Sequence, residues 1–131
     1  MKLSITALLL TALAATEVSA THQEKCQKKN GHVVQAIQQF CGKTNLVVPS
    51  NYAVLGAHVG TGGPQDTRVY ITGTCSPAQW VPQKYCLSQF YALCAGSPHG
   101  SKGDSQGSYG RHGCQNWNID VGGGRNVQDW K

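Results

Sequence analysis

Six cysteines constrain the fold of this 131-residue chain more than any other feature of its sequence. They lie at Cys26, Cys41, Cys75, Cys86, Cys94 and Cys114. An even number of cysteines in a short chain that follows a secretory leader is typical of a disulfide framework. We therefore predict three disulfide bonds. Six cysteines allow fifteen pairings, and the sequence alone does not select one of them.

The first twenty residues have the composition of a secretory leader. Lys2 supplies a positive charge, an apolar run extends from Leu3 to Ala15, and the small residues at 18–20 form a cleavage site. The apolar run is too short to cross a bilayer as a helix. We expect a signal peptide over residues 1–20 and a single cysteine-rich domain over residues 21–131, secreted to the extracellular space.

The cysteine spacing argues against a metal centre. Zinc sites use closely spaced pairs such as Cys-x-x-Cys, whereas the shortest spacing in this chain is from Cys86 to Cys94. A catalytic thiol is also disfavoured, because complete pairing leaves no cysteine over. We expect no metal, no cofactor and no catalytic residue.

The net charge is positive but not concentrated. The chain carries a formal charge of +5, which loss of the leader with Lys2 and Glu17 leaves unchanged. Such a charge favours approach to anionic surfaces, but it does not identify which anionic surface is the partner. No basic run is longer than Lys28-Lys29, and no aromatic-basic motif of nucleic-acid modules occurs. We expect a monomer, with no nucleic-acid partner and no transmembrane segment.

Two segments have helical periodicity. The first extends from Val33 to Cys41 and the second from Pro82 to about Ala95. Their apolar stripes consist of Val33, Ala36, Ile37, Phe40 and Cys41 in the first helix and Cys86, Phe90, Leu93 and Cys94 in the second. Each stripe includes cysteine, so a bridge between the helices, such as Cys41 to Cys94, is geometrically reasonable.

Alternating apolar residues predict the strands. Tyr52–Val59 and Thr67–Cys75 flank a glycine-rich connector and are typical of an antiparallel hairpin. Cys114–Val121 predicts a further strand, and we place a short one around Cys26. Residues 96–113 contain six glycines and are predicted to form a loop without helix or strand.

The order of these elements defines the fold class. A β-α-β-β-α-β sequence of helices and antiparallel strands predicts an α+β sandwich. In this sandwich two helices pack on one face of a four-stranded antiparallel sheet, and the disulfide bonds stabilise the packing.

Three short pieces of sequence carry a resemblance to a known family. They are Glu24-Lys25-Cys26-Gln27 before a helix that ends Phe40-Cys41, the triplet Gly73-Thr74-Cys75, and the run Gln89-Phe90-Tyr91-Ala92-Leu93-Cys94. With the order of elements, residues 23–95 resemble the α/β killer toxins of smut fungi, of the KP-six type, and the fungal effectors that share their fold. The resemblance implies a killer-toxin-like α/β sandwich.

The chain departs from this family in two respects. The toxin precursors are cleaved at basic pairs into two subunits, whereas this chain has one domain and only Lys28-Lys29, which lies inside the cysteine framework. The chain also has an additional helix cysteine, Cys86, and lacks a second cysteine just after Cys26. The resemblance therefore supports the fold more strongly than it supports a killing activity.

The resemblance implies a small secreted fungal effector or toxin-like protein that acts in virulence by binding a target and modulating host defence. The expected partner is an extracellular protein of a host or competitor, or a cell-wall or surface glycan. The stretch Tyr109–Trp117 is similar to a recurrent ending of small fungal secreted proteins and, more weakly, to small mushroom glycan-binding proteins. A lectin-like module is therefore the alternative function.

Two groups of residues are candidates for binding. One group lies on the outward face of the predicted hairpin, and the other lies in the glycine-rich loop. For the lectin alternative, an exposed tryptophan would stack on a sugar ring, whereas alternation with Ile119 places Trp117 in the core. The candidate residues are Arg68, Tyr70, Trp80, His99, Lys102, Tyr109, Arg111 and His112.

A small secreted ribonuclease is the enzymatic alternative. Two histidines, or a histidine and a glutamate, with an arginine can cleave RNA by general acid–base catalysis. Glu24 is the one glutamate that follows the leader, which argues against the histidine–glutamate mechanism. The two-histidine mechanism is left. Its candidates are His58, His99, His112, Arg68 and Arg111. No carboxylate is placed to orient a histidine in a recognisable triad, so we expect no enzymatic activity.

Overall fold

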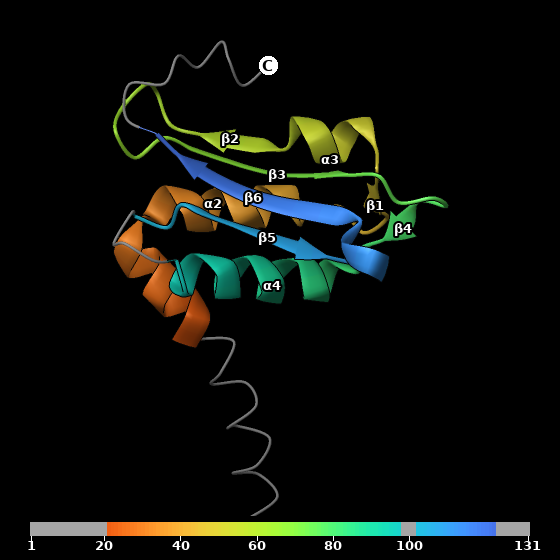
Figure 1. The fold of residues 1–131 in the computed structure, drawn as a ribbon. Coiled ribbons are helices and arrows are strands. Elements are labelled where there is room, and N and C mark those ends of the chain that lie inside the picture. The colour runs from red at the N-terminus through yellow and green to blue at the C-terminus, as the bar shows by residue number, and fades with distance from the viewer. Residues whose placement is uncertain (1–20, 98–101, 123–131) are drawn as a thin grey trace, which may run out of the picture.

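A computed structural model describes residues 21–97 and 102–122 (Figure 1). The predicted signal peptide at residues 1–20 lies outside these described residues. Residues 21–29 form a helix, which a break at Asn30 separates from the next one. The elements that follow are α2 (Gly31–Phe40), β1 (Val47–Val48), α3 (Asn51–Leu55), β2 (Ala57–Val59), β3 (Thr67–Gly73), β4 (Gln79–Trp80), α4 (Gln83–Ala95), β5 (Ser105–Tyr109), a 3-10 turn (Arg111–Gly113) and β6 (Gln115–Val121).

The main sheet has four strands in the order β2-β3-β6-β5, and each neighbouring pair is antiparallel. Helix α2 contacts β2 and β3, helix α4 contacts β5 and β6, and the two helices contact each other. Figure 1 shows α2 behind the sheet and α4 alongside β5. Strands β1 and β4 form a separate antiparallel ribbon. The predicted fold class, two helices on a four-stranded antiparallel sheet, is confirmed.

Alternation along β3 and β6 builds the core between the sheet and the helices. Val69 and Ile71 on β3 and Trp117 on β6 are fully buried, and Ile71 is the register partner of Trp117. The ring of Phe90 on α4 packs against the Trp117 ring with 4.6 Å between their centroids. Trp117 is therefore a core residue, as its alternation predicts.

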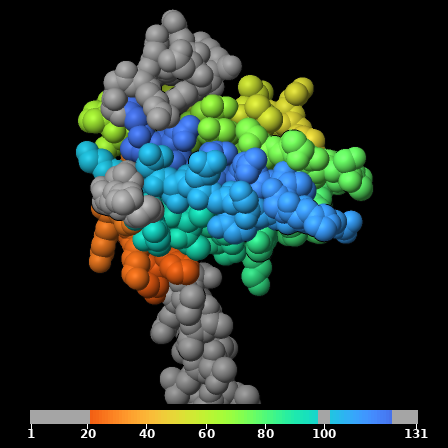
Figure 2. Space-filling model, viewed as in Figure 1, coloured from red at the N-terminus to blue at the C-terminus, as the bar shows by residue number. Residues whose placement is uncertain are grey.

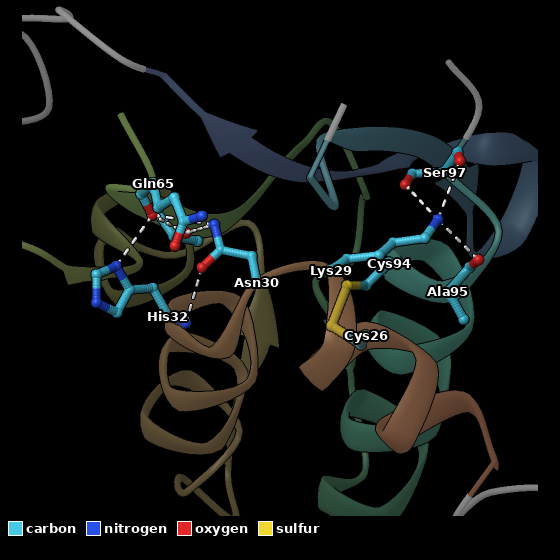
Figure 3. Close-up of a disulfide and its surroundings, with 9 residues drawn as sticks. Cys26, Lys29, Asn30, His32, Gln65, Cys94, Ala95 and Ser97 are labelled. Atoms are coloured by element: carbon cyan, nitrogen blue, oxygen red, sulfur yellow. Dashed lines mark hydrogen bonds between the residues drawn. A yellow bond between two sulfur atoms is a disulfide. The ribbon is translucent and has the colours of Figure 1, made fainter. Parts of the chain in front are cut away.

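Asn30 determines where α2 begins. Its side-chain oxygen accepts a hydrogen bond from the backbone N–H of His32 at 2.9 Å, as an N-cap residue does. Its amide nitrogen donates to the carbonyl of Gln65 at 3.0 Å. Figure 3 shows Nδ1 of His32 directed at the same carbonyl, 3.1 Å away. The start of α2 is thus fixed against the connector that precedes β3.

The predicted strand Tyr52–Val59 is wrong in its first half. Residues 51–55 form α3, and the strand begins only after it. The hydroxyl of Ser50 accepts a hydrogen bond from the N–H of Ala53 at 3.1 Å, which favours a helical turn over extended backbone. The Tyr52 hydroxyl donates to the last carbonyl of α2 at 2.7 Å, and burial raises the pKa of this phenol.

The predicted strand around Cys26 is also wrong, because Cys26 lies fully buried in the helix at residues 21–29. The residues around it are mainly glutamine, glutamate and lysine, which favour helix, and a single apolar position is too little to define a strand. None of the helices in the described part of the chain is long and apolar enough to cross a membrane.

The glycine-rich segment 96–113 is not the structureless loop that its composition predicts, because it contains β5. This strand pairs with β6 along its whole length. A Cβ on Gly107 would lie 2.6 Å from the ring of Tyr109, so the missing side chain leaves room for that ring. The Tyr109 ring packs edge-on against Trp117, with 5.6 Å between centroids. A strand with only one large apolar residue has no alternation that reveals it.

Three disulfides join all six cysteines, as predicted. The pairs are Cys26–Cys94, Cys41–Cys86 and Cys75–Cys114. The bridge from Cys41 to Cys94 that the helical stripes suggest is wrong. Because α2 and α4 run antiparallel, the cysteine after the end of α2 meets Cys86 near the start of α4 (Figure 1). Cys94, in the last turn of α4, meets Cys26 instead.

Lys29 fastens the end of α4 beside the Cys26–Cys94 disulfide (Figure 3). Its ammonium group donates to the carbonyls of Ala95 at 2.9 Å and Ser97 at 3.1 Å, and to the Ser97 hydroxyl at 2.9 Å. A positive charge at the C-terminus of a helix also interacts favourably with the last carbonyls. The second lysine of the pair Lys28-Lys29 therefore takes part in the helix packing.

We predict that Lys29→Met lowers the free energy of unfolding by about 2 kcal/mol, because it removes three hydrogen bonds from a charged donor. The control is Lys28→Met, because Lys28 is the exposed neighbour of Lys29. This substitution should change the free energy of unfolding by less than about 0.5 kcal/mol. Guanidinium unfolding followed by tryptophan fluorescence, with the disulfides intact, measures both. Equal effects of the two substitutions would contradict this role of Lys29.

Candidate functional site

A hollow of about 480 Å³ lies at the end of the sheet where β3 ends and β6 begins. Residues 74–79 and residues 111–114 line it. The Cys75–Cys114 disulfide joins these two segments covalently. They lie at the right-hand end of the molecule in Figure 1, and Figure 2 shows green and blue atoms meeting at the same edge.

Hydrogen bonds hold the two segments in place. The N–H of Thr74 donates to the carbonyl of Cys114 at 2.9 Å. The side-chain oxygen of Gln79 accepts from the backbone N–H of Arg111 at 3.2 Å and from the amide nitrogen of Gln115 at 3.0 Å. One amide oxygen on β4 therefore positions the turn that carries Arg111.

The backbone of this turn has a special conformation. Gly110 has a φ of +80°, and a Cβ there would lie 2.6 Å from the side-chain oxygen of Gln79. With a ψ of −178°, this positive φ is a backbone conformation that essentially only glycine adopts. His112 has a φ of 56°, which non-glycine residues adopt uncommonly. The turn presents both Arg111 and His112 as exposed side chains on the rim of the hollow.

The hollow offers hydrogen-bond donors to a ligand. Arg111 supplies a permanent positive charge, and Thr74 and Ser76 supply hydroxyl groups. None of the described lining residues carries a carboxylate. In the described part of the chain no cluster of three histidine, cysteine or acidic residues is arranged to hold a metal. The arrangement suits recognition of an anionic group.

The predicted pair Arg68 and Tyr70 lies elsewhere, on the outer face of β3. Both side chains alternate with buried residues and are half-buried. The Arg68 guanidinium donates to the carbonyls of Val54 at 2.6 Å and Leu55 at 3.4 Å, and it lies 3.9 Å from the centre of the Tyr70 ring. The Tyr70 hydroxyl donates to Asp120 at 3.0 Å. These contacts fix α3 to the sheet, so the pair is used within the fold.

Trp80, the predicted sugar-stacking residue, is 62% exposed on β4. Its indole N–H donates to the carbonyl of Thr44 at 2.9 Å, which fixes the orientation of the ring. Trp80 follows Gln79 along a strand, and successive side chains point to opposite sides. Trp80 is not one of the described residues that line the hollow.

The remaining predicted residues are dispersed. His99 lies outside the described residues. Lys102 is exposed in the turn before β5, with a φ of 59°, and Tyr109 packs on the core at the end of β5. Of the seven predicted binding residues that the structure describes, only Arg111 and His112 line the hollow.

The two described histidines among those considered for RNA cleavage, His58 and His112, do not converge. His58 on β2 is the register partner of Arg68 on β3. Arg68 lies five residues before Gly73, and Gly73 is the end of β3 that adjoins the hollow. At roughly 3.3 Å per residue, this separation is about 17 Å. His58 and His112 therefore do not face a common reacting bond.

The sequence did not identify the other wall of the hollow, residues 74–79. Apart from Cys75, nothing in the composition of these residues marks them as a site, since the others are threonine, serine, proline, alanine and glutamine. The signal that could have found them is the Cys75–Cys114 pairing, because it places residues 74–79 beside Arg111 and His112.

The chain matches no protein-family model, no curated protein and no solved structure. The resemblance to the killer toxins stays a prediction, and the candidate site depends on the geometry described above.

We predict that a mild phosphine reductant opens Cys75–Cys114 before the other two disulfides. Cys75 is 6% exposed and Cys114 is half-buried, and both line the hollow, whereas the other four cysteines are fully buried. Alkylation of the native protein followed by peptide mass spectrometry identifies the first thiols to appear. Earlier labelling of Cys26, Cys41, Cys86 or Cys94 would contradict the prediction.

Proposed function

We propose that this chain is a secreted, cysteine-rich fungal effector or toxin-like protein of the killer-toxin-like sandwich class. It acts in virulence, outside the producing cell, by binding a target on a host or a competitor. The leader-like sequence at residues 1–20 and the three disulfides support secretion into an oxidising environment. The sandwich of helices on an antiparallel sheet supports the class.

One observation carries the proposal of binding: the hollow beside Cys75–Cys114 has a fixed rim that presents Arg111 and His112 to solvent. The disulfide and the Gln79 hydrogen bonds hold this rim before any ligand arrives. A preorganised site loses less conformational entropy when its ligand binds.

Binding, rather than catalysis, is the role that the chemistry of the hollow supports. General acid–base catalysis needs groups that donate and accept protons on both sides of a reacting bond. Among the described lining residues, His112 is the only imidazole and there is no carboxylate beside it. We therefore propose that the protein is not an enzyme.

A lectin-like role is the second candidate, and the observation that favours it is Trp80. Its indole ring is 62% exposed, and its N–H is already bonded to Thr44. An exposed aromatic ring with a fixed orientation is suited to stacking on the apolar face of a sugar. Val47, its exposed partner on β1, extends the apolar surface beside the ring.

The test is binding to cell surfaces by fluorescently labelled protein purified from culture medium. We expect saturable binding to plant or microbial cells, and an increase of at least tenfold in Kd for the double variant Arg111→Gln, His112→Gln. This variant removes both rim side chains. Lys25→Gln is the matched control, because it removes one exposed positive charge from the helix at residues 21–29.

The outcomes separate the candidate functions. Loss of binding with Trp80→Ala, while the double rim variant still binds, would favour the lectin-like role. RNA cleavage by the purified protein that His112→Ala abolishes would favour a ribonuclease. If no cell surface binds the protein saturably, the proposal is wrong.

A further inference from the structure

The two arginines of the sheet region differ in what their guanidinium groups contact. Arg68 donates to the carbonyls of Val54 and Leu55 and covers the Tyr70 ring. Within the described part of the chain, the guanidinium of Arg111 makes no hydrogen bond or ion pair, although its backbone N–H is bonded to Gln79. Arg111 is therefore held by its backbone while its side chain is available to a ligand.

The hollow has one permanent positive charge among its described lining residues. A planar guanidinium forms two parallel hydrogen bonds with a carboxylate. Nucleic acids and anionic membranes are instead bound through several cations that contact successive phosphates or headgroups. A single arginine fits one isolated anionic group better than it fits a polyanionic backbone.

The other walls of the hollow match a hydroxylated ring. Thr74 and Ser76 provide hydroxyls that donate and accept hydrogen bonds, while Pro77 and Ala78 provide short apolar surface. Small-ligand sites typically occupy roughly 300–1,000 Å³, and this hollow has about 480 Å³. A sugar presents the same mixture of hydroxyl groups and apolar C–H faces.

We propose that the hollow binds an acidic sugar, with the carboxylate of a hexuronate unit paired to the Arg111 guanidinium. Thr74 and Ser76 contact the ring hydroxyls, and Pro77 contacts the C–H face. This inference rests on the proposed function, since it names the ligand class that the extracellular target presents. Uronate-containing polysaccharides of a cell surface are the corresponding partner.

The experiment titrates isotopically labelled protein with a trimer of galacturonic acid and follows backbone amide shifts by NMR. We expect the shifts to concentrate in residues 74–79 and 111–114 and to saturate. The fully methyl-esterified trimer, which has no charge, should bind at least tenfold more weakly. Arg111→Gln should weaken binding of the acid trimer at least tenfold, and Arg111→Lys should weaken it less.

The control variant is Lys25→Gln, which changes the net charge equally and lies in the helix at residues 21–29, away from the hollow (Figure 1). It should leave the Kd within twofold. Because the Arg111 side chain is exposed, the amide spectrum of Arg111→Gln should keep the wild-type pattern outside the hollow, which verifies folding.

Several results would overturn the inference. These are equal binding of the methyl ester, equal weakening by Lys25→Gln, or shifts that lie outside the two segments. Tighter binding of a sulfated sugar, a short RNA or a triglutamate peptide would replace the uronate with that ligand. If the uronate fails while cell-surface binding still depends on Arg111 and His112, the inference is wrong and the proposed function stands.

Discussion

Helix α4 is covalently bonded near both of its ends, to the helix at residues 21–29 and to the cysteine directly after α2, and the packing of the sandwich depends on these bonds. Cys86 near its start joins Cys41, and Cys94 in its last turn joins Cys26. All four cysteines are fully buried, so they also contribute apolar packing. In the chain-entropy account, bonds that span 45 and 68 residues each stabilise the fold by about 4 kcal/mol. This fixed helix covers β5, an edge strand with little apolar surface of its own.

The third disulfide has a different structural role. Cys75–Cys114 connects the segment after β3 to the start of β6, and it is the bond that borders solvent. It brings residues 74–79 beside Arg111, where the Gln79 side chain completes the wall of the hollow. The three bonds therefore have two structural roles, because two of them hold the helices and one shapes the candidate site.

The sequence predicted α2, α4, β3 and β6, in each of which several buried apolar residues recur at helical or strand spacing. It could not predict β5, because Gly107 leaves space for one tyrosine ring and no alternating apolar face exists. It assigned a strand to Cys26, where local helix preference and a long-range bond to Cys94 decide the structure. Arg111 and His112 were recognisable as candidates, whereas the wall that accompanies them depends on a cysteine pairing that the spacing leaves open.

Peptide mapping of the purified, non-reduced protein tests the central claim most directly. The account predicts three disulfide-linked peptide pairs, Cys26–Cys94, Cys41–Cys86 and Cys75–Cys114, with no free thiol. A free cysteine would contradict the framework. A different partner for Cys75 or Cys114 would remove the hollow and with it the candidate site.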